Sequence, residues 1–254
     1  MMNVLVEIDV INLKKEDNIY VLMLNNKPVN ALSQELISEL LILIEEILND
    51  KESRGLIIST EIDNFCAGAD LKERLFMSNE ETINTVYAIK KLFENIYNLP
   101  FPTLSLIKGG CLGGGLELTL NCDFRFGSSD SFYALPETSL GIIPGAGGTQ
   151  LLPRIIGLAN SKHMIYSSKK INAKKALEYG LIDKIVDNHL VENALEFMRE
   201  FIPQSRLSLK LAKKSINSGY NLDIKKALNI EFKEYIQTLD SEDRINALKK
   251  FKKS

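Results

Sequence analysis

Apolar and polar positions in the first quarter of the chain predict three strands and a helix. Residues 4–10 and 19–24 form short apolar runs, and the polar segment 14–18 between them is typical of a turn. Ser33 is a preferred N-cap residue, and a helical pattern follows it. Residues 55–59 then form a short apolar run of the kind found in buried parallel strands. The helical pattern consists of Leu36, Ile37, Leu40, Leu41, Ile44, Ile47 and Leu48.

This strand–helix–strand order is a crossover unit and favours an α/β fold. An amphipathic helix is predicted over 80–99, where Pro100 and Pro102 stop it. Strands are predicted over 103–107 and 124–127. Later helices are predicted over 151–156, 159–166, 190–202, 207–218, 224–239 and 242–251. A further helix is predicted to be capped by Asn172 and to end at Gly180, and a short strand is predicted over 181–186.

The hydrophobic pattern divides the chain into two parts. Strands and helices alternate over residues 1–188, whereas residues 189–254 are helical almost throughout. We therefore predict an α/β core that carries the active site, followed by a helical C-terminal region. The length of 254 residues is enough for one large domain, or for a domain with an appendage.

Charge and cysteine content exclude several kinds of protein. The formal net charge of -2 gives no general attraction to nucleic acid or to an anionic membrane, and no apolar run is long enough to span a bilayer. Cys66, Cys111 and Cys122 are odd in number and lack metal-site spacing, so reduced thiols are expected. The two histidines leave little basis for histidine catalysis or metal binding. The N-terminus does not look like a signal peptide, which predicts a cytoplasmic protein, or a mitochondrial one if a transit peptide precedes Met1.

Two glycine clusters surround a pair of glutamates in the middle of the chain. The first cluster, 113–115, runs directly into an apolar, helix-forming segment that contains Glu117. The second, 145–148, follows Glu137, which comes after a proline in a predicted loop. Glycine triplets cost backbone entropy, so they indicate that the backbone must closely approach another group. A loop that enters a helix also presents free N–H groups, which suit a carbonyl oxygen that gains negative charge.

The two carboxylates and the free N–H groups fit one reaction. Two carboxylates in different protonation states can take a proton from water and give one to the neighbouring carbon. The carbonyl that activates this carbon pair needs two N–H donors, for which Gly114 and Ala69, in a second loop of small residues, are the candidates. Ordinary structural roles are the alternative: Glu117 as an exposed helix residue and Glu137 as an N-cap or turn carboxylate. A catalytically silent scaffold is a further alternative, although no structural need places carboxylates beside glycine-rich loops.

Four motifs occur in order along almost the whole chain. They are Phe65-Cys66-Ala67-Gly68-Ala69-Asp70-Leu71-Lys72, Gly113-Gly114-Gly115-Leu116-Glu117-Leu118, Cys122-Asp123, and Pro136-Glu137 followed by 141–150. With these motifs the sequence resembles the enoyl-CoA hydratase/isomerase (crotonase) superfamily and, within it, the methylglutaconyl-CoA hydratase group of AU-RNA-binding homologues. The resemblance implies a crotonase-like ββα spiral whose helical C-terminal region makes trimers and helps to cover coenzyme A.

The resemblance also implies a role for each site residue. Glu117 and Glu137 would act on a bound water that Gly145 helps to place, and the N–H groups of Ala69 and Gly114 would form the oxyanion hole. Both glutamates are present, which favours hydration of a 2-enoyl-CoA, with 3-methylglutaconyl-CoA as one candidate substrate, over isomerisation or other thioester chemistry of the superfamily. We assign Glu117 as the base toward water and Glu137 as the acid toward the α-carbon. The remaining predicted contacts to coenzyme A or the acyl chain are Ala67, Asp70, Leu71, Lys72, Leu75, Phe76, Met77 and the helix over 80–99.

Partners and cofactors follow from the same resemblance. It implies a homotrimer, or a hexamer made of two trimers, that acts on an acyl-CoA and needs no metal or redox cofactor. RNA binding is an alternative of a different class, because the named group includes RNA-binding homologues. The first long helix here carries Glu35, Glu39, Glu45 and Glu46 and no lysine before Lys51, so it would repel phosphate. Nucleic acid and membranes are therefore not expected partners.

Overall fold

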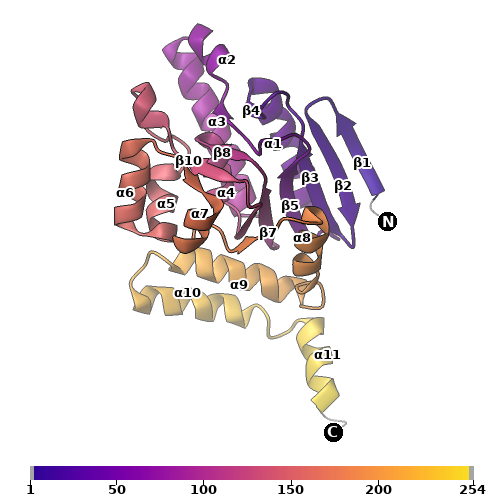
Figure 1. Cartoon of the computed structure of the whole chain (residues 1–254). Coiled ribbons are helices and arrows are strands. Elements are labelled where there is room, and N and C mark those ends of the chain that lie inside the picture. The colour runs from indigo at the N-terminus through magenta and orange to yellow at the C-terminus, as the bar shows by residue number, and fades with distance from the viewer. Residues whose placement is uncertain (1–2, 252–254) are drawn as a thin grey trace.

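The computed structural model describes residues 3–251 and shows an α/β fold, as the sequence predicts. Its largest sheet has seven strands in the order β1-β2-β3-β5-β7-β9-β12. The strands from β3 to β12 run parallel, and β1, β2 and β3 are antiparallel neighbours (Figure 1). These strands are β1 (Asn3–Ile8), β2 (Ile11–Glu16), β3 (Ile19–Leu24), β5 (Gly55–Thr60), β7 (Thr103–Ile107), β9 (Phe124–Gly127) and β12 (Lys184–Ile185).

Two smaller sheets lie near the loops that carry the candidate site. One pairs β4 with β6, and the other has the order β11-β10-β8. Within the second sheet, β10 and β8 are parallel, so the glycine-rich segment after β8 lies beside the segment that leads to Glu137. The strands are β4 (Ala31–Leu32), β6 (Gly68–Ala69), β8 (Gly110–Leu112), β10 (Phe132–Ala134) and β11 (Ile171–Asn172).

Helices connect the parallel strands. Ser33 caps α1 by accepting a hydrogen bond from the N–H of Leu36, and Asn172 caps α7 by accepting from Lys175, as expected from their side chains. The helices are α1 (Gln34–Asn49), α2 (Leu71–Phe76), α3 (Asn79–Tyr97), α4 (Gly114–Leu120), the 3₁₀ helix η1 (Glu137–Leu140), α5 (Gly148–Ile156), α6 (Leu158–Ser167), α7 (Ala173–Glu178), α8 (Leu190–Arg199), α9 (Arg206–Gly219), α10 (Ile224–Ile236) and α11 (Glu242–Phe251).

The predicted turn at 14–18 is wrong in its extent. Residues Ile11–Glu16 form β2, which pairs with strands on both sides, and the turn is confined to Asp17 and Asn18, both with positive φ. The strand carries Lys14, Lys15 and Glu16 at its end, where side chains are only partly buried. Backbone pairing to β1 and β3 supplies the hydrogen bonds, so the polar side chains do not prevent strand formation.

The large sheet is covered on both faces, which explains its apolar strands. Successive strand residues point to opposite faces, so Ile57 of β5 packs in a different cluster from its neighbours Leu56 and Ile58. Helices α1 and α3 contribute to the larger cluster. Helix α8 contributes Leu195 and Met198 to the smaller one, where they pack against strand residues. Burial on both faces fixes the positions of the loops at the strand ends.

Helices α9 and α10 lie side by side below the sheet, and α11 extends away from the rest of the molecule (Figure 1). Helix α10, the end of α9 and the C-cap residue of α9 carry large apolar side chains that are mostly exposed. These are Ile216, Tyr220, Ile224, Leu228, Phe232 and Tyr235. The predicted division at residue 188 and the predicted role of the C-terminal helices in oligomerisation stay predictions. In the part of the chain that the structure describes, no helix combines the length and apolar character of a membrane span.

Candidate active site

Two loops are held together by backbone hydrogen bonds where α4 begins. The N–H of Cys66 donates to the carbonyl of Gly110 at 3.0 Å, and the N–H of Leu112 donates to the carbonyl of Cys66 at 2.9 Å. This pairing places the loop of small residues after Cys66 alongside β8. The first glycine cluster therefore lies against the second loop predicted to supply an N–H donor.

Glycine makes the close approach between these loops sterically feasible. Gly68 has a φ of 89°, and a Cβ there would lie 2.9 Å from the carbonyl oxygen of Leu112 and 3.1 Å from the nitrogen of Gly114. A Cβ on Gly114 would lie 3.9 Å from the nitrogen of Ala69. Gly114 is the first residue of α4, where N–H groups lack acceptors within the helix. The structure thus brings together the two predicted oxyanion-hole residues, Ala69 and Gly114.

Glu117 is buried and is bound by backbone N–H groups from the second glycine cluster. The residue is 3% exposed. Its Oε1 accepts hydrogen bonds from the N–H groups of Ala146 and Gly148, both at 2.8 Å, and Gly148 is the first residue of α5. Burial raises the pKa of Glu117, while the two N–H donors oppose this shift by stabilising the carboxylate. The alternative that Glu117 is an exposed helix residue is therefore wrong.

Glu137 occupies a more apolar environment with fewer donors. It begins η1 and is 8% exposed, and burial raises its pKa to about 7, with the charge of Glu117 adding to the increase. Its Oε2 is buried and has no hydrogen-bond partner among the described residues. A buried carboxyl oxygen without a protein partner is available to a reactant. Glu137 is thus the member of the pair that is more readily protonated near neutral pH.

A single cavity of about 850 Å³ contains both glutamates and most of the predicted site. Its lining is largely apolar side chains and glycine, and both carboxylates belong to it. A cavity of this size and composition suits a small-molecule ligand oriented by a few polar groups. The predicted residues that line it are Ala67, Ala69, Leu71, Gly114, Glu117, Glu137 and Gly145.

Asp70 and Lys72 were predicted to contact coenzyme A, but neither lines this cavity. Asp70 is the N-cap of α2, and its Oδ1 accepts hydrogen bonds from the N–H groups of Lys72 and Glu73 at 2.9 and 3.2 Å. Lys72 is exposed on α2. The structure therefore gives Asp70 a local folding role, and contacts of either residue with coenzyme A stay predictions.

The expected acyl-chain lining is only partly correct. Leu75 and Phe76 are 77% and 85% exposed, and neither they nor Met77 line the cavity. Helix α3 does line it, through Thr82, Val86 and Ile89. Leu75 and Phe76 lie on α2, a helix with no buried residue, so their apolar character does not turn them inward.

Arg74 is a cavity residue that the sequence patterns did not predict. It is half-buried, and burial lowers the pKa of its guanidinium. The segment Asp70-Leu71-Lys72-Glu73-Arg74 contains two basic residues. Helical spacing alone does not show which basic side chain of a short helix turns inward. The structure selects Arg74 and leaves Lys72 in solvent.

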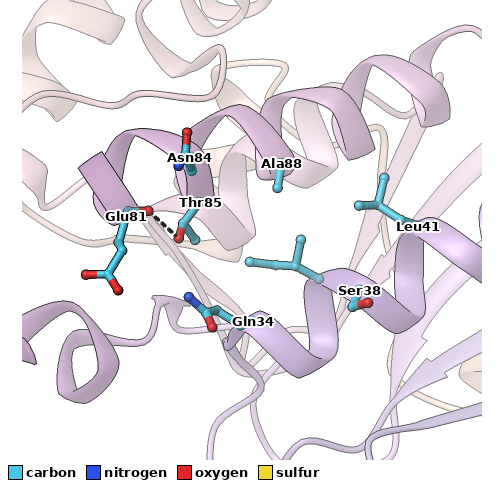
Figure 2. A pocket seen from close by; sticks show the side chains of 8 residues that line it. Gln34, Ser38, Leu41, Glu81, Asn84, Thr85 and Ala88 are labelled. Atoms are coloured by element: carbon cyan, nitrogen blue, oxygen red, sulfur yellow. Dashed lines mark hydrogen bonds between the residues drawn. The ribbon is translucent and has the colours of Figure 1, made fainter. Parts of the chain in front are cut away.

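A second cavity of about 350 Å³ lies between α1 and α3 and carries no comparable chemistry (Figure 2). Its lining includes Gln34 and Ser38 of α1 and Asn84 and Thr85 of α3. The Thr85 hydroxyl donates to the carbonyl of Glu81 within α3, at 2.8 Å. Acid–base chemistry on a substrate by paired carboxylates is thus confined to the larger of these two cavities.

The cysteines belong to the core. Cys66, Cys111 and Cys122 are free and buried, and burial raises the pKa of Cys66 to about 12 and that of Cys122 to about 11. A thiol with so high a pKa is a poor nucleophile. Among the described residues, no group of three or more histidine, cysteine, aspartate or glutamate side chains is arranged to hold a metal ion.

Comparison with known proteins places this arrangement in a family. The enoyl-CoA hydratase/isomerase family model matches residues 14–254. The chain belongs to the enoyl-CoA hydratase/isomerase family. The family resemblance noted in the sequence is thereby confirmed. The matched residues include Glu117, Glu137 and the two glycine clusters.

Individual relatives and solved structures agree with this assignment. The chain is 42% identical over 229 residues to the mitochondrial methylglutaconyl-CoA hydratase of Homo sapiens, covering 88% of this chain and 68% of that protein. It is 38% identical to the probable enoyl-CoA hydratase 2, mitochondrial, of Arabidopsis thaliana, covering 89% and 76%. The crystal structure of an enoyl-CoA hydratase from Bacillus anthracis superposes with a TM-score of 0.92 at 37% identity, covering 96% of each chain. The predicted crotonase-like fold is confirmed.

Proposed function

We propose that this protein hydrates a 2-enoyl-CoA thioester to the 3-hydroxyacyl-CoA. The observation that carries the proposal is the pair of buried glutamates in one cavity, one bound by two N–H donors and one with a free buried oxygen. Membership of the enoyl-CoA hydratase/isomerase family and similarity to proteins named as hydratases support the same reaction.

The two environments support the division of labour between the glutamates. Glu117, whose Oε1 accepts two backbone hydrogen bonds, is the better-stabilised carboxylate and is proposed as the base that takes a proton from water. Glu137, with its pKa near 7, is proposed as the acid that gives a proton to the α-carbon. Gly145, which lines the same cavity, would leave room for the water between them.

The thioester oxygen would be bound by the N–H groups of Ala69 and Gly114. As water attacks the β-carbon, negative charge moves to this oxygen, and two fixed N–H donors stabilise it without reorganisation. The loop contacts around Gly68 support this placement, because they hold the two residues side by side. No step of this scheme requires a metal or a redox cofactor.

The partner proposed for the cavity is an acyl-CoA, and Ala67 and Leu71 are proposed to contact it. The exposed apolar side chains of α9 and α10 support a homotrimer or a dimer of trimers. Nucleic acid is not proposed as a partner, because α1 carries Glu35 in its first turn and no basic residue in its last.

Loss of enoyl absorbance on incubation of the purified protein with crotonyl-CoA tests the proposal. We expect turnover in the wild-type protein and a large loss in both Glu117→Gln and Glu137→Gln. Absence of turnover with crotonyl-CoA, with its carboxylated analogue glutaconyl-CoA and with longer 2-enoyl-CoA substrates would overturn the proposal.

A further inference from the structure

The catalytic cavity contains a cation, which the hydration of a simple fatty-acyl chain does not require. Arg74 is the one basic side chain in its described lining, among apolar neighbours such as Leu71, Val86 and Ile89. No carboxylate oxygen among the described side chains lies within 4.0 Å of its guanidinium nitrogens, since it forms none of the ion pairs in the structure. A partly buried cation without an anionic partner in a ligand cavity is costly for folding alone. It therefore calls for a role in binding.

The protein holds Arg74 in place without an ion pair, although the charge of the nearby Glu73 partly opposes the effect of burial on the pKa of Arg74. Its Nη1 donates to the carbonyl oxygen of Thr82 at 3.1 Å, which links α2 to α3. The adjacent carboxylate of Glu73 is engaged elsewhere, because its Oε2 accepts a hydrogen bond from the N–H of Gln34 at 3.0 Å. One nitrogen is thus fixed by a neutral acceptor, while the guanidinium has further N–H donors to offer.

Helix α3 relates Arg74 to the reacting atoms. Thr82, Val86 and Ile89 line the cavity at a helical spacing of four and three residues, so they share one face of α3. Val86 lies beside the proposed water site, because a Cβ on Gly145 would lie 3.4 Å from its Cγ1. Thr82, which holds Arg74, is one helical turn away, at about 6 Å along the axis. Water attacks the β-carbon of the substrate, so a group of the acyl chain that lies two or three bonds beyond this carbon would come within reach of Arg74.

We infer that Arg74 is a specificity-determining residue that binds a carboxylate at the far end of a short 2-enoyl-CoA acyl chain. A guanidinium pairs with a carboxylate through two parallel N–H···O bonds, which provides both affinity and orientation. This assignment rests on the proposed hydratase function and names the substrate class within it. Lys72, three residues along from Ala69 and exposed, has no such access to the cavity.

Two substrates that differ by one carboxylate test this inference. Crotonyl-CoA and glutaconyl-CoA have the same enoyl thioester, but only the second ends in a carboxylate. We expect Arg74→Gln to lower kcat/KM for glutaconyl-CoA by about 10- to 100-fold, the usual effect of losing a charge-assisted hydrogen bond. The value for crotonyl-CoA should change by less than about threefold, which also reports that the variant is folded. Arg74→Lys should recover part of the loss, because lysine keeps the positive charge but lacks the two parallel N–H donors of the guanidinium.

Lys91→Gln is the matched control, because it also removes one positive charge, from an exposed position on α3 outside the cavity. It should change kcat/KM for neither substrate. An equal loss on both substrates in Arg74→Gln would assign the arginine to coenzyme A or to folding, and no loss on either would remove it from binding. Both results would overturn the inference.

Binding of saturated analogues separates this inference from the proposed reaction. The ratio of the Kd values for glutaryl-CoA and butyryl-CoA, measured by calorimetry, does not depend on turnover. Arg74→Gln should weaken glutaryl-CoA selectively even if the wild-type protein hydrates neither enoyl substrate, which would contradict only the proposed function. An unchanged ratio would contradict the role of Arg74 while leaving hydration of crotonyl-CoA intact.

Discussion

Gly113 lies so close to Glu137 that a Cβ at position 113 would be 2.8 Å from Oε1 of the glutamate. The φ of Gly113 is 51° with a ψ of -126°, a conformation that L side chains rarely adopt. Glycine at this position therefore sets both the path of the chain into α4 and the position of the proposed acid. The N–H of Gly113 also donates to the carbonyl of Ala134 at 2.9 Å, which ties the same residue to β10.

Gly113→Ala should lower kcat by at least about tenfold, because small displacements of an acid–base group are costly to catalysis. The control is Gly157→Ala, since Gly157 also has a positive φ, of 79°, but a Cβ there would meet nothing within 4 Å. Both substitutions should reduce stability by about 1–3 kcal/mol, as expected for strained backbone. Steady-state kinetics and urea unfolding would measure the two effects, and equal kcat values in the two variants would contradict the role given to the contact.

Glu117→Gln and Glu137→Gln should each lower kcat by about 10²- to 10⁴-fold, the usual contribution of general acid–base catalysis. The amide has nearly the shape of the carboxyl group, so binding of the substrate should change less than the rate. Glu45→Gln, on the exposed side of α1, is the control and should keep wild-type activity. A change of less than threefold in both site variants would rule out the proposed acid–base pair.

The rate should depend on the proton of Glu137. Its pKa of about 7 means that the acid form is present below neutral pH and is lost above it. The kcat/KM of the wild-type protein should therefore fall as the pH rises above about 7, because this parameter reports ionisations of the free enzyme. The residual activity of Glu137→Gln should lack that decrease. A wild-type profile that stays flat from pH 6 to 9 would show that Glu137 does not donate the proton.

Stability should follow the same group in a defined direction. The folded-state pKa of Glu137, about 7, is above the ordinary value of 4.5, so the folded protein holds a proton that the unfolded chain has lost between these values. The contribution of Glu137 to stability is thus complete below pH 4.5 and is lost as the pH rises to 7. The free energy of unfolding of Glu137→Gln, relative to that of the wild type, should therefore be larger at pH 8 than at pH 5 by at least about 1 kcal/mol. Paired urea titrations at both values would show it, and a constant difference would contradict the shift.

Gly114→Pro should abolish turnover while leaving the protein folded. Proline removes the N–H proposed for the oxyanion hole, yet it is well tolerated at the first position of a helix, which Gly114 occupies in α4. Gly114→Ala keeps the N–H, and its Cβ would meet the end of the Leu32 side chain at 2.9 Å, a contact that a rotation can relieve. The alanine variant should therefore retain measurable activity. Similar rates in the two variants would place the donor elsewhere.

Most helices and strands could be predicted from the sequence, because an element that buries one face has apolar residues at a regular spacing. The prediction failed at β2, where Lys14 and Lys15 suggested a turn although the backbone pairs on both sides. Burial of Glu117 was also not visible in the pattern, because its N–H donors come from residues about thirty positions later in the chain. Neither the inward position of Arg74 nor the capping role of Asp70 follows from spacing, since α2 is too short to define an apolar face.

The two sides of the catalytic cavity differ in how firmly the fold holds them. Gly115 to Leu120 of α4 are all buried, whereas α2 has no buried residue. Local opening free energies follow such burial, so backbone amides of α4 should exchange with deuterium far more slowly than those of α2. Glu117 thus lies on a rigid wall of the cavity, whereas α2, which carries Arg74, forms a compliant one. A family of hydratases built on this plan could change its acyl preference through α2 without disturbing the reaction geometry.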